Sequence, residues 1–394
     1  MPTSSSNWNS GYRFPILDSS GNATTTTEDL SNMFVRYEDF LASQLWGVGY
    51  NNYGQLGQNT TAAYSSPVQV GTLTNWKQVA CGYSYSVAVK TDGTMWGCGR
   101  NNMGQLGQNN VSPYSSPVQV GSLTNWKQVA CGNRHILAIK TDGSLWSCGY
   151  NGQGQLGQNN TTSYSSPVQV GLLTNWKQVS AGYYHTAAIK TDGSLWSCGY
   201  NIKGQLGQNT TAAYSSPVQV GTLTNWKQVA CGRYHTVAVK TDGSLWSCGY
   251  NNLGQLGIGS TSNTNSPVMV GTLYNWKQVA CGYQHTVAVK TDGSLWSCGY
   301  NNAGQLGQNN TTSYSSPVQV GLLTNWKQVA CGYRHTVAVK TDGSLWSCGY
   351  NNAGQLGQNN TTNYSSPVQV GSLTNWKQVA AWSRNTAGIQ TPGY

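Results

Sequence analysis

The residues best suited to chemistry are histidines that recur at one position of a repeated sequence. They are His135, His185, His235, His285 and His335, with Tyr85 and Asn385 in the two remaining copies. Imidazoles can bind a metal ion, but residues tens of ångströms apart around a ring of repeats cannot share one zinc ion at roughly 2 Å. We therefore expect no metal site. Each histidine should instead hydrogen-bond to a neighbouring turn, as Tyr and Asn also can.

The carboxylates are equally regular. Asp precedes Gly in six copies of KTDGSLW or its variant, at Asp92, Asp142, Asp192, Asp242, Asp292 and Asp342. Six identical copies cannot all face one substrate, and glycoside hydrolysis usually needs two carboxylates at a fixed separation. The motif resembles the Asp-box turn of sialidases but lacks their residue between Asp and Gly. All other acids lie in residues 18–39. We predict no catalytic residue, no cofactor and no enzymatic activity.

The eleven cysteines fall at two positions of the repeat, which Cys81 and Cys98 represent. Ala181 and Ala381 replace the first of them, which indicates a small buried side chain. Because the total is odd and no CxxC pair occurs, the sequence favours free thiols over a disulfide framework or a zinc site.

The charge distribution argues against nucleic acid as a partner. The 394-residue chain has a net charge of +10, although only 8% of its residues are charged. Residues 1–43 are net acidic, and most of the positive excess is one lysine per repeat, from Lys77 to Lys377. Nucleic-acid binding needs a clustered basic face, which this even distribution does not provide. No run of roughly 18 apolar residues is present, so we also expect no membrane insertion.

The elements that must position these residues follow from a repeat of 50 residues. The pattern LWSCGYNxxGQLG and its variants place tryptophan at Trp46, Trp96, Trp146, Trp196, Trp246, Trp296 and Trp346. Each repeat contains four short apolar runs bounded by Gly, Asn, Asp or Pro, which predicts four strands. Repetition at this period predicts an all-β, seven-bladed propeller of four-stranded antiparallel blades.

Local signals order the strands within a blade. Asp-Gly predicts a two-residue hairpin turn between the second and third strands. Pro267 and its equivalents predict the start of an outer edge strand, where a missing N–H costs no ladder bond. The small residues of Ala230-Cys231-Gly232 fit where blades crowd the axis, so we expect the first strand to be innermost.

Two segments distant in sequence should complete one blade. Residues 375–391 supply only the first two strands of a blade and residues 44–70 only the last two, so pairing them leaves no exposed edge at the seam. The predicted organisation is an N-terminal extension or anchor segment, 1–43, and a propeller, 44–394. Its blades lie near 75–120, 125–170, 175–220, 225–270, 275–320 and 325–370, and the seventh combines 375–391 with 44–70.

The pattern VACGxxHTVAVKTDGSLWSCGYNxxGQLG resembles the regulator of chromosome condensation repeat family, over residues 44–391. The resemblance implies a seven-bladed propeller. It does not imply one function, because the family includes an exchange factor for a small GTPase, ubiquitin-ligase modules, bacterial secreted proteins and phage proteins. The exchange factors have blade-specific insertions and acidic loop residues, which these equal-length repeats lack.

The copies differ mainly in two loops, one between the first and second strands and one after the third. Both loops leave the same end of an antiparallel blade, so their variation gathers on one rim. We hypothesise that this rim binds a partner, because it presents Tyr and Arg, which are favoured interface anchors; the alternative is drift. The candidate residues are Tyr53, Tyr83, Met103, Arg134, Gln153, Tyr184, Lys203, Arg233, Tyr234, Leu253, Arg334 and Arg384.

The N-terminal segment differs in composition from the repeats. Ser, Thr and Asn are frequent in its first half, and its second half contains Phe34, Tyr37 and Phe40, which we expect to serve in attachment. A polar leader, a small anchor and a repetitive head resemble the layout of phage tail-fibre and other virion appendage proteins.

Two function classes follow from this layout. The first is a non-enzymatic virion appendage of tail-fibre or receptor-binding type, located on the virion or extracellular surface. It would attach to other virion or surface-assembly proteins through residues 1–43 and bind a host glycan or protein through the propeller rim. The second is a cytoplasmic protein-interaction propeller, such as a guanine-nucleotide exchange factor for a small GTPase. Low charge, missing insertions and near-identical copies favour the first.

Overall fold

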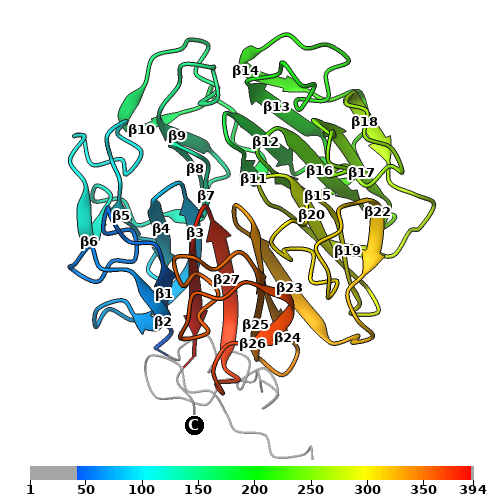
Figure 1. The fold of residues 1–394 in the computed structure, drawn as a ribbon. Helices are drawn as coiled ribbons and strands as arrows, with labels where there is room; N and C mark the ends of the chain where they lie inside the picture. Colours follow the sequence, from blue (N-terminus) through cyan, green and yellow to red (C-terminus); the bar gives the residue numbers. More distant parts are fainter. Residues whose placement is uncertain (1–41, 392–394) are drawn as a thin grey trace, which may run out of the picture. The chain divides into compact units, whose positions relative to one another are not determined.

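Seven four-stranded antiparallel sheets make up the part of the chain that the computed structural model describes, residues 42–391. The sheets follow one another in chain order around a ring, as the colours of Figure 1 show. This confirms the predicted seven-bladed propeller. The attachment residues proposed above, Phe34, Tyr37 and Phe40, lie outside the described residues. Within the described range, no helix is long and apolar enough to span a membrane.

Six blades are continuous in sequence, and their strands run from the axis outwards in chain order. Blade 1 contains β3 (Trp76–Gly82), β4 (Tyr85–Lys90), β5 (Met95–Gly99) and β6 (Tyr114–Gln119). Blade 2 contains β7 (Trp126–Cys131), β8 (His135–Lys140), β9 (Leu145–Gly149) and β10 (Tyr164–Gln169). Blade 3 contains β11 (Trp176–Ala181), β12 (His185–Lys190), β13 (Leu195–Gly199) and β14 (Tyr214–Gln219). Blade 4 contains β15 (Trp226–Cys231), β16 (His235–Lys240), β17 (Leu245–Gly249) and β18 (Thr264–Met269). Blade 5 contains β19 (Trp276–Cys281), β20 (His285–Lys290), β21 (Leu295–Gly299) and β22 (Tyr314–Gln319), and blade 6 contains β23 (Trp326–Cys331), β24 (His335–Lys340), β25 (Leu345–Gly349) and β26 (Tyr364–Gln369).

The seventh, closing blade joins the two ends of the repeat region, as predicted. Its strands are β27 (Trp376–Trp382), β28 (Asn385–Gln390), β1 (Gln44–Gly49) and β2 (Tyr64–Gln69), in that spatial order. Strands β1 and β28 pair without a register shift along their whole length. In Figure 1 the red β27 accordingly lies beside the blue strands of the first repeat. Pairing across the seam leaves no free strand edge inside the closing blade.

The innermost strands, β3, β7, β11, β15, β19, β23 and β27, line an axial channel of about 240 Å³. Their glutamines link neighbouring blades. The Gln78 amide donates to the Val129 carbonyl at 3.1 Å and accepts from the Val129 N–H at 2.9 Å. Between the closing blade and blade 1, the Gln378 side-chain oxygen accepts from the Val79 N–H at 3.1 Å. These bonds satisfy backbone groups on the inner edges of the blades. The expectation that the first strand is innermost is confirmed.

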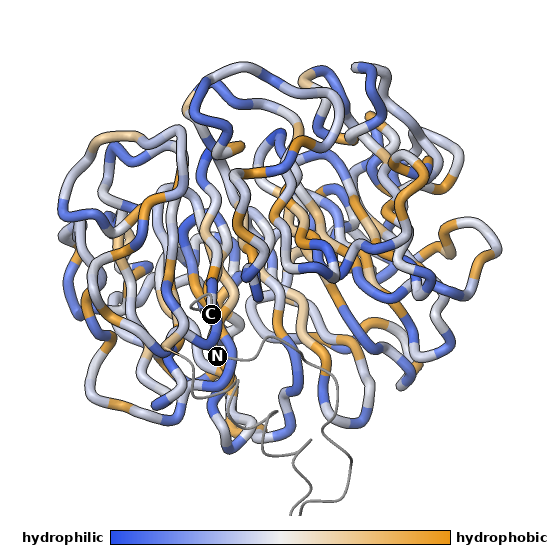
Figure 2. The backbone as a smooth tube through the Cα atoms, turned by 90° about the horizontal axis from the view of Figure 1, so that it is seen from below, coloured by the Kyte–Doolittle hydropathy of each residue, from blue (hydrophilic) through white to orange (hydrophobic). Residues whose placement is uncertain are grey.

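The apolar core lies between blades. Leu137, Ile139 and Leu145 of blade 2 pack against Trp176 and Val179 of blade 3, and the other interfaces repeat this arrangement. Figure 2 shows apolar stretches recurring along the chain between polar ones. The second strand of each blade has a neighbouring blade on either side, so it is buried almost along its whole length.

The tryptophans and a second lysine of each repeat form a stacked cluster at the edge of this core. The rings of Trp126 and Trp146 meet edge to face at 6.1 Å, and the Lys140 ammonium lies 3.6 Å from the Trp146 ring centroid. Burial lowers the pKa of the Lys140 ammonium. A cation–π contact of this kind contributes on the order of 1 kcal/mol. In the closing blade Gln390 takes the place of the lysine.

The histidines hydrogen-bond between blades. The Thr336 hydroxyl donates to the Gln305 carbonyl at 2.7 Å, so its oxygen accepts from the Nε2–H of His285 at 3.2 Å. Equivalent contacts of 3.0–3.2 Å join four of the five histidines to the threonine of the next blade. The predicted structural role is therefore correct, but the partner is a threonine of the neighbouring blade and not a turn.

Two departures from the repeat at this position compensate for each other. Blade 2 has Ile136 where five blades have Thr and blade 1 has Ser86, so a histidine in blade 1 would have no hydroxyl to contact. Blade 1 has Tyr85 instead, whose hydroxyl donates to the carbonyl of His135 at 2.6 Å. The longer side chain thus reaches the backbone of the neighbouring blade.

The buried histidines predict an acid-sensitive fold. Burial lowers the pKa of all five from 6.5 to about 3. Between these values the unfolded chain binds protons that the folded chain does not, so stability falls as the pH is lowered from 6.5 towards 3. In urea unfolding over this range, His285→Asn should make the slope of unfolding free energy against pH shallower by about 1.4 kcal/mol per pH unit.

The aspartates of the turns affect the pH dependence of stability only at the acidic end of this range. Hydrogen bonds from the hydroxyl and the backbone N–H of Ser294 lower the pKa of Asp292 below its usual 3.8. The stability that this carboxylate contributes is therefore lost only as the pH falls below 3.8, and the slope above that pH reports the histidines. An unchanged slope in His285→Asn would contradict a neutral buried imidazole.

The Asp-Gly connection differs from the prediction. The Gly93 N–H donates to the Lys90 carbonyl at 3.0 Å, and the Lys90 N–H donates to the Thr94 carbonyl at 2.9 Å. These bonds close a three-residue connection in which Gly93 alone has a positive φ, of 78°. The predicted two-residue turn is therefore wrong, because a type I turn followed by a left-handed glycine forms instead. The Asp92 carboxylate caps the turn by accepting the Thr94 N–H at 2.9 Å.

The repeated proline is also placed differently. Pro117 lies inside β6, the outermost strand of its blade, and not at the start of that strand. The pairing of β5 with β6 is irregular between Gly97 and Gly99, so the strand tolerates a residue without an N–H at this edge. The outer-edge part of the prediction is correct.

The thiols take no part in cross-linking within residues 42–391. All eleven cysteines are free and buried, which confirms the prediction. Burial raises the pKa of Cys81 and Cys98 to about 12, so neither is a thiolate near neutral pH.

Candidate functional site

The variable loops of all blades meet on one end of the propeller, which we call the Tyr–Arg face. It consists of the loops between the first and second strands and those between the third and fourth strands of each blade. Backbone bonds connect the two kinds of loop. The Tyr150 N–H donates to the Arg134 carbonyl at 2.8 Å, and the Tyr200 N–H donates to the Tyr184 carbonyl at 2.9 Å. The Tyr333 N–H donates to the Ser383 carbonyl of the next blade at 2.9 Å, so neighbouring blades are also linked at this face. The Asp-Gly turns lie at the opposite end.

One position of the first loop is directed to the axis in most blades. Its occupants are Tyr83, Asn133, Tyr183, Arg233, Tyr283, Tyr333 and Ser383. The rings of Tyr283 and Tyr333 lie 4.1 Å apart, and those of Tyr183 and Tyr283 lie 6.1 Å apart. The four tyrosines of this set, with Trp382 and Ser383, surround a chamber of only about 10 Å³. They close this end of the axial channel.

Arg233 packs into this aromatic cluster. Its guanidinium carbon lies 4.1 Å from the Tyr283 ring centroid, 4.6 Å from that of Tyr234 and 5.5 Å from that of Tyr183. Its Nε is buried without a hydrogen-bond partner among residues 42–391. The rings thus hold a cation that no carboxylate of the described chain neutralises.

Beside the closed centre is an open cavity of about 340 Å³, which we call the mouth pocket. Phenol rings form most of its wall, and two arginines and two serines complete it. The lining residues are Tyr50, Tyr53, Tyr83, Ser84, Arg100, Tyr183, Tyr283, Tyr333, Ser383 and Arg384.

All charged side chains in the loops of the Tyr–Arg face, as the structure describes them, are positive. They are Arg100, Arg134, Lys203, Arg233, Arg334 and Arg384. The acids within residues 42–391 all belong to the Asp-Gly turns at the other end. The opposite end combines these acids with lysines of the repeats, such as Lys77 and Lys90, so the two ends differ in the presence of acids and not in the sign of their net charge.

Burial raises the pKa of the tyrosines at the centre of this face. The pKa values of Tyr183 and Tyr283 lie above the usual 10, mainly because burial removes water from around the phenols. Their hydroxyls therefore stay protonated near neutral pH and can donate hydrogen bonds.

The predicted rim residues divide into two groups. The structure brings Tyr83, Tyr184, Arg233 and Tyr234 into the central aromatic cluster, and Tyr53 and Arg384 into the wall of the mouth pocket. Arg334 also reaches the cluster, because its guanidinium carbon lies 5.2 Å from the Tyr333 ring centroid and 5.1 Å from that of Tyr300. Lys203 instead lies 5.4 Å from the Tyr250 ring. Among residues 42–391, no side-chain bond or ring stack joins the cluster or the pocket wall to Met103, Arg134, Gln153 or Leu253.

Sequence reasoning missed part of this surface. Tyr183, Tyr283 and Tyr333 belong to the central cluster but were not among the candidate residues, and neither were Tyr50 and Arg100 of the mouth pocket. A signal for the first three existed, since they share one column of the repeat with Tyr83. No sequence signal shows that this column is directed to the axis.

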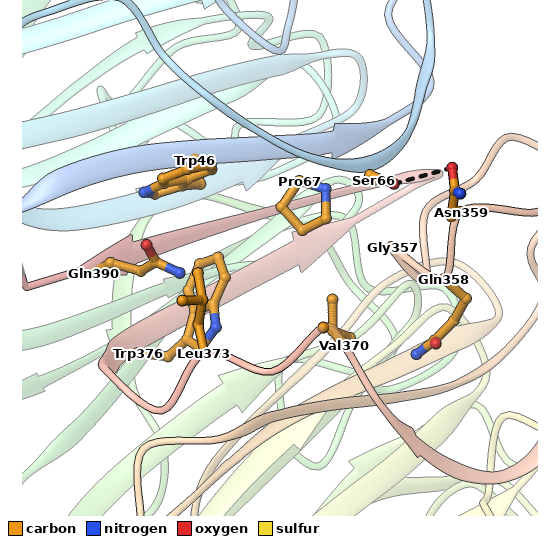
Figure 3. Close-up of a pocket in the computed structure, with 11 residues that line it drawn as sticks. Trp46, Ser66, Pro67, Gly357, Gln358, Asn359, Val370, Leu373, Trp376 and Gln390 are labelled. Atoms are coloured by element: carbon orange, nitrogen blue, oxygen red, sulfur yellow. Dashed lines mark hydrogen bonds between the residues drawn. The ribbon is translucent and has the colours of Figure 1, made fainter. Parts of the chain in front are cut away.

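A second kind of concavity lies between neighbouring blades. Figure 3 shows the one beside the closing blade, of about 320 Å³, where Trp46 and Trp376 meet edge to face near Pro67. The Ser66 hydroxyl donates to the Asn359 side-chain oxygen at 3.3 Å in its wall. A groove of about 420 Å³ recurs at the same register between blades 1 and 2. It is therefore a property of the repeat, whereas the mouth pocket occurs once among the cavities described.

Comparison with known families agrees with this geometry. The family model of the RCC1-like domain matches residues 109–390, which is more than half of the chain. The chain belongs to the RCC1-like domain family. Models of the regulator of chromosome condensation (RCC1) repeat also match residues 43–89 and 76–105. The resemblance inferred from the repeat motif is thereby confirmed. No curated protein sequence matches the chain at a significant level.

Solved RCC1-like structures share the fold over nearly the whole chain. Human WBSCR16 has a TM-score of 0.81 and 23% identity, over 90% of this chain and 100% of that one. Prp20p from Saccharomyces cerevisiae has a TM-score of 0.80 and 19% identity, over 91% of this chain and 95% of that one, and its structure is reported with its binding properties to Gsp1p and histones. Yeast RCC1 (Prp20) bound to Kap60 gives a TM-score of 0.82 at 19% identity, over 91% and 92% of the two chains. At these identities the likeness establishes the fold alone.

Proposed function

We propose that this RCC1-like propeller is a non-enzymatic binding protein that recognises a protein partner through its Tyr–Arg face. The observation that carries the proposal is the convergence of variable loops from several blades into one aromatic and cationic surface. Tyr and Arg are among the side chains that most often dominate binding energy at protein interfaces. The uniformly positive charge of these loops favours a partner with an acidic surface, because complementary charge accelerates association and excludes wrong partners.

The chemistry of the remaining polar groups supports binding over catalysis. The histidines are neutral and bonded between blades, the described thiols are protonated, and the carboxylates cap hairpin turns. None of these groups lines the mouth pocket. A general base or an activated nucleophile would need access to a bound substrate, which these positions do not offer.

A small GTPase is the first partner class to test, because the family includes an exchange factor for one. Solved propellers of this fold include Prp20p, whose binding to Gsp1p has been studied. For this chain we propose binding without nucleotide exchange. The described repeats have equal lengths, so no inserted segment extends from the Tyr–Arg face towards a nucleotide site.

The test combines partner capture with two matched charge reversals. The full chain is crosslinked in an extract of its source cells, and crosslinked sites are mapped by mass spectrometry. Crosslinks should fall in the loops of the Tyr–Arg face. Arg233→Glu with Arg334→Glu should weaken binding of the identified partner at least about tenfold, because the reversed charges then oppose those of the partner. The control, Lys227→Glu with Lys327→Glu at the opposite end, should stay within about twofold.

Two results would overturn the proposal. One is a crosslink map confined to the outer strands or the Asp-Gly end, with binding insensitive to Arg233→Glu and Arg334→Glu. The other is nucleotide release from a small GTPase accelerated by the purified chain, which would make the protein an exchange factor and not a passive binder.

The virion-appendage hypothesis remains a separate prediction. It depends on the layout of residues 1–43, most of which the structure does not describe, and on a repetitive neutral-polar head. Its partners would be virion assembly proteins and a host glycan or protein. Co-purification of the chain with virus particles would support it, whereas recovery only from the cytoplasm of cells that produce no virus would contradict it.

A further inference from the structure

The mouth pocket exists because two serines interrupt the ring of large side chains. Ser383 occupies the position that carries Tyr in four blades, Arg in blade 4 and Asn in blade 2. Ser84 occupies the next position of the loop, where other blades carry Arg, Tyr or Gln. Both serines have a positive φ, of 48° and 64°, unlike the other residues at their positions. The loops of blades 7 and 1 therefore leave a gap, which forms the mouth pocket.

Two arginines flank this gap. Arg100 follows β5 of blade 1, where the other blades have Tyr, and its guanidinium carbon lies 5.2 Å from the ring centroid of Tyr53. The Nε–H of Arg100 donates to the Asn102 side-chain oxygen at 2.9 Å, and this bond orients the guanidinium group. Arg384 comes from the closing blade and lies 5.8 Å from the Tyr350 ring. The two cations thus approach the pocket from both sides of the seam.

Neither cation is neutralised within the described chain. Arg100 and Arg384 form no ion pair among residues 42–391, and the described loops of this face contain no acid. The phenols around the pocket add hydrogen-bond donors to the same space. A cavity with two cations, several hydroxyl donors and no carboxylate is complementary to an oxyanion, because charged hydrogen bonds from a fixed guanidinium fork are strong and directional.

We propose that the mouth pocket binds an acidic side chain of a protein partner, with its carboxylate or phosphate between Arg100 and Arg384 and its stem against the tyrosine rings. The inference rests on the proposed function and adds the chemical group that this face recognises. It also says where on the face that group binds, because Arg100 and Arg384 are the two of its six cations that line the pocket.

The chain supplies its own matched variants for the test. Arg384→Gln introduces the residue that blade 5 has at this position, Gln284, and Arg134→Gln makes the same substitution outside the pocket. Arg100→Tyr restores the residue of the other blades, such as Tyr150. All the introduced side chains therefore occur naturally in this loop framework, and melting curves show whether each variant folds like the parent.

The probes are fluorescein-labelled ligands added to the full chain and followed by anisotropy. An oligoglutamate peptide and a phosphoserine peptide should bind more tightly than a sialylated oligosaccharide, whose carboxylate lacks the flexible stem of an acidic side chain. An oligoglutamine peptide should not bind. Arg384→Gln and Arg100→Tyr should each weaken binding about tenfold, as expected for loss of one charge-assisted contact. Arg134→Gln should change it by less than about twofold. The ratio between the two anionic peptides identifies carboxylate or phosphate as the preferred group.

Several outcomes would overturn the inference. They are failure of both anionic peptides to bind, an Arg134→Gln effect equal to that of Arg384→Gln, and selective binding of the sialylated oligosaccharide in place of either peptide. An equal effect would indicate general attraction to a basic face. If the partner still crosslinks to the Tyr–Arg face while Arg384→Gln and Arg100→Tyr bind it normally, the pocket inference fails and the proposed function stands.

Discussion

Deletion of residues 375–394 is expected to abolish cooperative unfolding of the propeller. The deletion removes β27 and β28, and with them the buried side chains of Trp376, Val379 and Ile389. Loss of each such side chain costs about 2–5 kcal/mol, whereas the net stability of a domain is about 5–15 kcal/mol. It also exposes the edge of β1, which otherwise pairs with β28. Circular dichroism and calorimetry of the truncated chain should show no transition resembling that of the full chain.

A complementation experiment provides the control for this deletion. A synthetic peptide of residues 375–394 should restore the transition in a concentration-dependent manner, because β28 can pair with β1 without a covalent connection. A truncated chain that melts like the full protein would contradict closure of the ring through the closing blade.

Gly293→Ala is expected to destabilise the protein by about 3 kcal/mol or more. Gly293 has φ +79° in the Asp-Gly connection of blade 5, and a Cβ at this position would overlap the carbonyl oxygen of Thr324 in the loop to blade 6. Because the obstacle is backbone, the clash cannot be relieved by rotation of a side chain. Urea unfolding would measure the loss.

Gly271→Ala separates the clash from the backbone conformation. Gly271 has φ +63°, and no atom beyond its chain neighbours lies within 4 Å of the position of its Cβ. Gly271→Ala should therefore lower the free energy of unfolding only by the cost of placing alanine in the left-handed conformation, about 1–2 kcal/mol. Equal losses in the two variants would show that the close approach at Thr324 does not constrain the fold.

Much of the fold could be predicted because the repeat is a local signal. Strand number, ring closure and the innermost position of the first strand followed from apolar runs and from small residues such as Cys231. The hairpin connection did not, since Asp-Gly is compatible with both two- and three-residue turns and the hydrogen bond of Gly93 selects one. The histidine partner was also missed, because Thr336 lies in the next blade.

The candidate site shows the same division. The variable columns predicted that Tyr83 and Arg233 would share a face, because loops at one end of an antiparallel blade are neighbours. That Tyr283 meets Arg233 at the axis, and that Ser383 leaves a pocket between Arg100 and Arg384, depended on the direction of each side chain in the closed ring.

By itself, the sequence determined the architecture of this protein, because a periodic pattern of strands and turns has one compact solution when its two ends pair. Only the tertiary structure decided which of the variable side chains meet. Ring closure brings residues as distant in sequence as Tyr50 and Arg384 into the wall of one pocket, and no local pattern encodes that proximity.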